Sequence, residues 1–287
     1  MSSDRYLQRL RVCHTADRAA FEPWFVGAAL AGHVHVERVA RLLVPPTPFV
    51  RSAGRLQLLG ADFAARSQAV AQLARCLAAE GLARAPLGEL YPVAAEGSGE
   101  ELLQVDRAVV PWFGVKARGV HLNGFVRTPA GLELWVARRS RGKRTFPGHL
   151  DNLVAGGQSI GLSARATLEK ECHEEAGLPA ALAAQALSVG ELSYVQQDGQ
   201  ALKPDTLACF DLELPADFVP RPVDGEVESF VRWPLPTVAA SLRSEEAWKP
   251  NCALVVLHFL LRHGGLDGEL SAGQRETLWR ALRGEPT

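Results

Sequence analysis

The sequence predicts an α/β protein in which a mixed sheet lies between layers of helices, preceded by a smaller α/β region. Two observations lead to this fold class. Segments of strand type lie on both sides of a well-capped helix at residues 164–176, and a polar, glycine-containing stretch at residues 94–99 separates this part from an N-terminal part with its own helix and strand signals.

The N-terminal part predicts three helices and one strand. Residues 6–12 and 36–43 have amphipathic helical spacing, and Pro45-Pro46 ends the second of these segments. Residues 56–59 are a strand candidate. The strongest helix signal covers 63–79, where Asp62 is a suitable N-cap. We expect residues 94–99 to form the hinge or loop between the two parts.

Strand signals dominate from Gly119 onward. A turn at Thr128-Pro129-Ala130-Gly131 joins two strand candidates, and three more follow the 164–176 helix. The five strand candidates are 120–127, 132–138, 187–195, 207–214 and 227–233. Residues 252–262 are apolar over too great a length for an ordinary strand and predict a buried helix, and 271–282 predict a last amphipathic helix.

These elements predict three divisions of the chain. Residues 1–108 would form an accessory α/β domain, residues 109–268 the main domain, and residues 269–287 a C-terminal helix and tail.

Composition fits a globular protein of ordinary charge. The 287 residues are 47% hydrophobic and 22% charged with a formal net charge of −1, so bulk charge gives no reason to expect nucleic-acid binding. Five scattered cysteines without a CxxC pair predict reduced thiols. The charged first residues and the lack of an apolar membrane-length run predict a cytoplasmic protein that does not enter a membrane. The oligomeric state stays open.

The most informative segment is the helix at residues 164–176. Ser163 is a plausible N-cap and Gly177 a plausible C-terminal cap. Glu171, Glu174 and Glu175 are spaced so that they share one helix face. Three carboxylates held together favour a bound cation, and oxygen ligands favour Mg²⁺ or Mn²⁺. A solvated acidic face is the alternative.

Residues 156–178, GGQSIGLSARATLEKECHEEAGL, resemble the Nudix box, G-x5-E-x7-R-E-U-x-E-E-x-G-U with U aliphatic. Gly156 matches the first glycine, and Glu171, Glu174 and Glu175 match three of its glutamates. Lys170 replaces the usual arginine, and Leu162 replaces the first glutamate. The resemblance implies an α/β/α sandwich and Mg²⁺-dependent hydrolysis of a diphosphate. The three glutamates and the carbonyl of Gly156 or its neighbour would hold the metal.

Other motifs indicate a subfamily. They resemble those of Nudix proteins that carry an extra N-terminal region and are similar to the Nudix portion of some eukaryotic thiamin pyrophosphokinases. The motifs are Phe113-Gly114-Val115, Gly119-Val120-His121-Leu122-Asn123-Gly124, Phe146-Pro147-Gly148-His149-Leu150-Asp151-Asn152, Asp224-Gly225-Glu226-Val227-Glu228 and Lys249-Pro250-Asn251-Cys252. This resemblance implies a small-molecule substrate, thiamin diphosphate or its oxidised analogues, hydrolysed to the monophosphate.

The catalytic base and the phosphate-binding residues are less specified. In Nudix enzymes the base lies in the box or in a later loop, so Glu175, Glu226 and Glu228 are candidates. Glu226 and Glu228 are two residues apart at the start of a predicted strand and should share a face, unless they are solvated turn residues.

Three cations are candidates for contacting the second phosphate. They are Arg138, Lys143 and Lys249, and for each of them an ordinary surface charge is the more common interpretation.

Three alternatives remain. The substrate could be a nucleoside diphosphate derivative of the ADP-ribose, NADH or coenzyme A type. Because of Leu162, the domain could also bind such a ligand without turning it over. An isopentenyl-diphosphate isomerase-like activity is disfavoured, because that chemistry uses a cysteine and none lies between Cys76 and Cys172.

Overall fold

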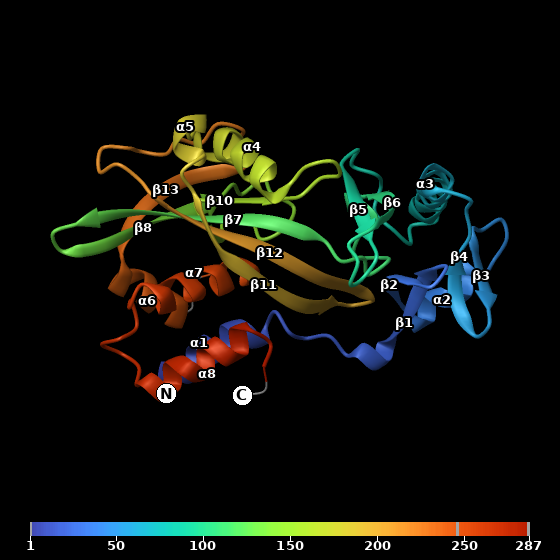
Figure 1. The fold of residues 1–287 in the computed structure, drawn as a ribbon, viewed down its shortest axis with the longest axis horizontal. Coiled ribbons are helices and arrows are strands. Elements are labelled where there is room, and N and C mark those ends of the chain that lie inside the picture. The colour runs from blue at the N-terminus through green and yellow to red at the C-terminus, as the bar shows by residue number, and fades with distance from the viewer. Residues whose placement is uncertain (1, 245–246, 286–287) are drawn as a thin grey trace.

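The computed structural model describes residues 2–244 and 247–285 and has a larger lobe and a smaller lobe (Figure 1). A seven-stranded sheet forms the centre of the larger lobe, with the main order β11-β12-β7-β8-β13. Strand β10 pairs with β7, and β9 pairs with β8. The strands are β7 (Arg118–Thr128), β8 (Gly131–Arg139), β9 (Leu150–Asp151), β10 (Val154–Gly157), β11 (Leu187–Asp198), β12 (Ala201–Glu213) and β13 (Val227–Pro234). Because β7 and β12 are parallel and the other pairs antiparallel, the sheet is mixed, as predicted.

Helices cover both faces of this sheet, which confirms the predicted sandwich. On one face lie α4 (Ala164–Ala176) and the short α5 (Ala180–Ala183). On the other lie four helices: α1 (Ser2–Arg11), α6 (Leu235–Arg243), α7 (Pro250–Arg262) and α8 (Ala272–Leu282). All residues of α7 from Cys252 to Leu261 are buried, because the sheet and its neighbouring helices enclose it. This explains an apolar run too long for a strand.

Strand β7 is the centre of this arrangement. Its residues from Val120 to Val126 are all buried. Since side chains alternate along a strand, Leu122 packs into the core beneath α4, whereas His121 and Phe125 face the α7 layer. The buried polar side chains of β7 have partners in the loop after β9 and on β12: His121 and Asn123 both bond Asn152, and Asn123 also donates to Asp211.

The smaller lobe contains two sheets and two helices. Its four-stranded sheet has the order β2-β1-β4-β3, and β5 and β6 form a separate antiparallel hairpin. The elements are β1 (Phe21–Val26), β2 (Ala29–His35), α2 (Val36–Leu42), β3 (Phe49–Ser52), β4 (Arg55–Leu58), α3 (Phe63–Ala79), β5 (Leu90–Ala94) and β6 (Glu101–Asp106). Trp24, Phe49 and Phe113 pack together in its core.

The prediction that residues 94–99 form an interdomain hinge was wrong. These residues form the turn between β5 and β6, within the smaller lobe. Glycine-rich polar composition is common to hairpin loops and linkers, so it does not distinguish them. The chain instead enters the larger lobe after the 3-10 helix Arg107–Val109.

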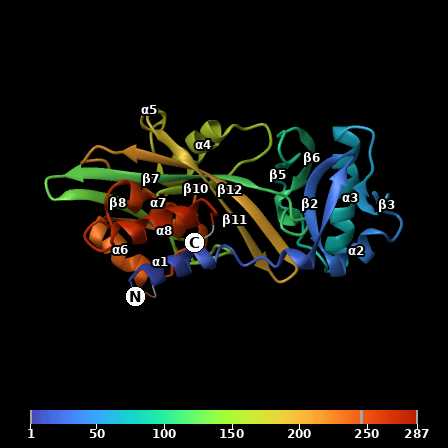
Figure 2. The same cartoon turned by 60° about the horizontal axis from the view of Figure 1, so that its bottom comes forward.

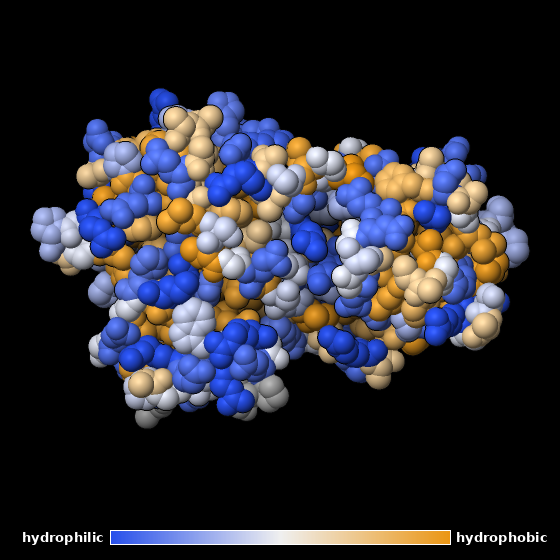
Figure 3. All heavy atoms as spheres, viewed as in Figure 1, coloured by the Kyte–Doolittle hydropathy of each residue, from blue (hydrophilic) through white to orange (hydrophobic). Residues whose placement is uncertain are grey.

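Helix α1, at the start of the chain, lies on the larger lobe, and the chain then runs to β1 in the smaller lobe (Figure 1). The helix packs against α6, α7 and α8 (Figure 2), and its Tyr6 is fully buried there. The Tyr6 hydroxyl donates to the carbonyl of Ala239 at 3.3 Å and to the Glu269 carboxylate at 3.1 Å. Figure 3 shows hydrophilic residues gathered over this helical layer. In residues 2–244 and 247–285, no helix has both the length and the apolar character to cross a membrane.

Candidate metal and phosphate site

Helix α4 is fixed at both ends by the predicted caps. The Ser163 side chain accepts a hydrogen bond from the amide of Ala166 at 3.1 Å. Gly177 has a left-handed φ of 62°, and its amide donates to the carbonyl of His173 at 3.2 Å. Leu168 and Cys172 are buried on the side that faces the sheet. The caps and this apolar face together determine where the glutamates lie.

Two of the three glutamates lie against β10. A Cβ built on Gly156 would lie only 2.3 Å from Cγ and Cδ of Glu171, so that carboxylate arm rests directly on the glycine. Glu175, which is 6% exposed, accepts a hydrogen bond from the amide of Ala155 at 2.9 Å. Burial and nearby carboxylates raise the pKa of Glu171, and burial raises the pKa of Glu175 well above its ordinary value.

Lys170 lies between the outer carboxylates. Its ammonium group contacts Glu174 at 2.6 Å and Glu171 at 3.2 Å. Glu174 is half exposed, whereas Glu171 is largely enclosed. The side chain that replaces the usual arginine of the box therefore contributes a charge to both glutamates, without a planar fork.

The residues present fit a hard divalent cation. Glu171 and Glu175 offer oxygen ligands whose charged forms are disfavoured by burial, and a dication would offset that cost. Leu162 leaves the loop without the first glutamate of the box. The loop is braced differently, because the Gln158 side-chain amide donates to the carbonyl of Leu162 at 2.7 Å.

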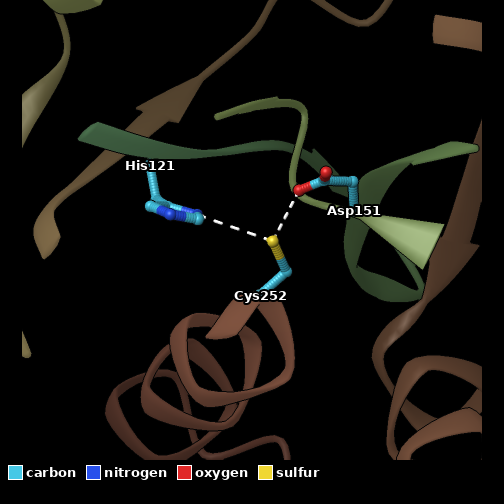
Figure 4. A group of neighbouring side chains, drawn as sticks. All are labelled: His121, Asp151 and Cys252. Carbon is cyan, nitrogen blue, oxygen red and sulfur yellow. Dashed lines mark hydrogen bonds between the residues drawn. The ribbon is translucent and has the colours of Figure 1, made fainter. Parts of the chain in front are cut away.

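Next to the glutamates lies a buried polar cluster of His121, Asp151 and Cys252 (Figure 4). The Cys252 thiol donates to Asp151 at 2.6 Å and lies 3.7 Å from Nδ1 of His121. Arg139 pairs with Asp151 at 2.8 Å, and Lys249 pairs with it at 3.4 Å.

We interpret this cluster as an ion-pair network and not as a metal site. Two cations already neutralise Asp151; although burial opposes its charge, Lys249 and Arg139 lower its pKa to about 2. Burial raises the pKa of Cys252 well above its ordinary value, so the thiol keeps its proton. A dication here would face two positive charges and a protonated sulfur.

The cluster also corrects the reasoning about cysteines. The fold brings Cys252 from α7 to the strand that precedes the box, so the sequence interval between Cys76 and Cys172 was the wrong place to search. The thiol is nevertheless 0% exposed and hydrogen-bonded to a paired carboxylate. It is therefore in no position to take a proton from a substrate carbon.

The predicted phosphate-binding cations have different surroundings. Arg138 donates to the carbonyl of Gly148 at 2.9 Å and so holds the loop before β9. Lys143 pairs with Glu226 at 2.5 Å. Lys249 is largely buried and close enough to Glu175 for the two charges to interact.

The two later glutamates do not share surroundings. The charge of Glu226 acts on Glu171, so Glu226 lies near the glutamates of α4. Glu228 lies 3.7 Å from Arg141. The register of β13 shifts between Val227 and Ser229, and a bulge there breaks the strand alternation on which a shared face depended.

Sequence reasoning gave no role to several residues around the glutamates. Asp151, His121 and Cys252 lie in motifs that we had singled out, but nothing in those motifs indicated that they meet. No local sequence motif marked Tyr91 and Arg107 of the smaller lobe as site residues, although Tyr91 lies near Glu171 and Arg107 near Glu226.

Known proteins resemble this chain over most of its length. A family described as a domain of unknown function, DUF4743, matches residues 5–117. The Arabidopsis thaliana protein Nudix hydrolase 20, chloroplastic, is 44% identical over 206 residues, which are 72% of this chain and 55% of that protein. The chain thus spans about half the length of that relative. The Saccharomyces cerevisiae protein YJR142W, named uncharacterized, is 33% identical over 252 residues, covering 82% of this chain and 73% of that protein.

Among solved structures, the Nudix domain of Shewanella oneidensis NrtR complexed with ADP-ribose has a TM-score of 0.42 and 14% identity. The match covers 52% of this chain and 90% of that one.

Proposed function

This chain belongs to the Nudix hydrolase family, and on that premise we propose that it hydrolyses the phosphoanhydride bond of a small diphosphate with Mg²⁺ or Mn²⁺. One observation supports this most directly. Glu171, which is largely enclosed, rests on Gly156, and the buried Glu175 accepts a hydrogen bond from the amide of Ala155, so two carboxylates converge on one short strand.

The side chains divide the work as follows. Glu171, Glu174 and Glu175 would hold the cation, together with the carbonyl at Gly156. A divalent cation bound there neutralises phosphate oxygens and lowers the pKa of the attacking water. Glu226 is the better placed of the two later glutamates to accept the proton from water, because it lies near Glu171, and Lys143 holds its carboxylate. Glu175 is the alternative base within the box.

We further propose thiamin diphosphate or an oxidised analogue as the substrate. The support is the resemblance of the flanking motifs, among them the one that contains Lys249. Lys143, which pairs with Glu226, and Lys249, which pairs with Asp151, place positive charge beside the α4 glutamates. We expect phosphate oxygens of the substrate to bind near these two lysines. Arg138 would act indirectly, since it holds the loop at Gly148. A cytoplasmic location stays a prediction.

A substrate panel tests the proposal. The purified chain is incubated with Mg²⁺ or Mn²⁺ and thiamin diphosphate, its oxidised forms, ADP-ribose, NADH or coenzyme A, and the phosphate products are quantified. Glu175→Gln should reduce turnover by about a hundredfold or more. Glu169→Gln is the matched control, because Glu169 is an exposed glutamate on the same helix.

The outcomes separate the alternatives. Turnover of a nucleotide derivative alone would replace the substrate and keep the reaction class. Saturable binding without turnover, unchanged in Glu175→Gln, would show a binding domain and overturn the hydrolase.

A further inference from the structure

The smaller lobe touches the loop that leads into α4. The carbonyl of Leu90 on β5 accepts a hydrogen bond from the amide of Ile160 at 2.9 Å. The Ser159 hydroxyl donates to the carboxylate of Glu89 at 3.2 Å. Two neighbouring residues at the start of the β5 hairpin thus hold two neighbouring residues of the glycine-bearing loop.

The smaller lobe also contacts β10, the strand that carries Gly156 and Gly157. A Cβ built on Gly157 would lie 1.6 Å from the Tyr91 hydroxyl and 2.7 Å from the adjoining ring carbon. Gly157 has no positive φ, so close approach and not backbone conformation requires glycine here. Tyr91 is 5% exposed. Its ring packs behind Gly157, next to Gly156, on which Glu171 rests.

Arg107 places a positive charge beside Glu89 and Tyr91, the residues of the smaller lobe that contact the loop and β10. It forms an ion pair with Glu89 at 2.7 Å, and its amide donates to the Glu89 carbonyl at 2.8 Å. Its guanidinium lies 5.9 Å from the centre of the Tyr91 ring. The side chain is 51% exposed, and its charge acts on Glu226. Arg107 therefore lies on the side of the smaller lobe that faces the candidate base.

We propose that the smaller lobe completes the active site: Tyr91 is a positioning residue for the strand that carries Gly156, and Arg107 binds the anionic end of the diphosphate. The assignment rests on the proposed function. A planar guanidinium, one edge of which Glu89 holds, presents its other donors in a fork that matches phosphate oxygens. The domain of unknown function then has a role, because it supplies one wall of a site whose metal ligands lie in the other lobe.

Arg107 is tested by ligand binding without turnover. Imidodiphosphate, which keeps two linked phosphoryl groups but resists hydrolysis, is titrated by calorimetry with Mg²⁺ present. Arg107→Gln should weaken its binding about tenfold, in line with the loss of one charged hydrogen-bond donor, and Arg107→Lys should restore part of the loss. Arg51→Gln is the matched control, because Arg51 is an exposed arginine of the same lobe paired with Glu22. Binding by Arg107→Gln equal to that of the unaltered chain would overturn the role of Arg107.

Tyr91 is tested by Mn²⁺ affinity, measured by electron paramagnetic resonance. Tyr91→Leu and Gly157→Ala should each weaken Mn²⁺ binding several-fold. In Tyr91→Leu/Gly157→Ala the new methyl group enters the space left by the hydroxyl and the outer part of the ring, so the double variant should lose less than the two single losses combined. Circular dichroism checks folding; if Gly157→Ala does not fold, Tyr91→Leu alone decides.

The results distinguish the two proposals. Unchanged Mn²⁺ affinity in folded Tyr91→Leu would overturn the positioning role while leaving the hydrolase intact. If the unaltered chain binds neither Mn²⁺ nor imidodiphosphate, the proposed function and this assignment both fail.

Discussion

Gly156→Ala should disable the site by displacing one carboxylate. The added methyl carbon would lie 2.3 Å from Cγ and Cδ of Glu171 and 2.7 Å from its Oε2. Carbon atoms in contact need about 3.5 Å, so the glutamate or β10 has to move by roughly 1 Å. A displacement of that size at a catalytic group costs about a hundredfold in rate. The overpacking should also destabilise the fold by about 1–3 kcal/mol.

The assay is Mg²⁺-dependent phosphate release, with kcat and the half-saturating Mg²⁺ concentration measured separately. Thermal unfolding establishes that the variant is folded. Gly273→Ala is the control: a Cβ on Gly273 in α8 meets nothing within 4 Å, so activity and stability should stay close to those of the unaltered chain. If Gly156→Ala has a normal kcat and a normal Mg²⁺ dependence, activity does not require the contact between Glu171 and Gly156, and the reasoning is refuted.

Three further predictions concern other parts of the molecule. Asp151→Asn leaves two enclosed cations without their carboxylate and should lower the free energy of unfolding by about 3–5 kcal/mol in urea; a loss below 1 kcal/mol would contradict the network. Leu162→Glu restores the missing carboxylate of the box and should lower the half-saturating Mg²⁺ concentration several-fold, and no change would show that the loop needs no fourth glutamate. Burial, with the charge of Arg262, lowers the pKa of His258 from 6.5 to about 4. As the pH falls below 6.5, His258 is therefore protonated in the unfolded chain but stays neutral in the folded chain until about pH 4. Stability should therefore fall between about pH 6.5 and 4, and His258→Phe, which keeps an aromatic ring against Trp279, should reduce that fall in urea titrations.

Local signals located six of the helices but missed α5 and α6. Ser163 and Gly177 bound α4, and Asp62 caps α3 through the amide of Ala65, because caps act over three or four residues of the chain. The strand candidates of the larger lobe are all present, since alternation and turns are also local. The structure extends each of them at one or both ends, although β12 stops at Glu213, one residue before the predicted end.

Long-range contacts were beyond local signals. Cys252 and Asp151 are 101 residues apart in the chain, and Ser159 and Glu89 are 70 apart. The composition around Tyr91 does not indicate which glycine its ring will meet. The supposed interdomain hinge that proved to be a hairpin turn has another cause: β5 and β6 pair locally, but the glycine-rich composition of their turn does not distinguish a hairpin from a linker.

The packing of α1 has a consequence for the order of folding. Tyr6 contacts Ala239 and Glu269, which follow it by 233 and 263 residues. Closing so long a loop costs only slightly more entropy than closing one half as long, but it delays the contact until the later residues have been synthesised. The apolar face of α1 therefore stays exposed, or is covered by transient partners, while the smaller lobe folds. We expect docking of α1 onto α6, α7 and α8 to be a late folding step that follows synthesis of these helices.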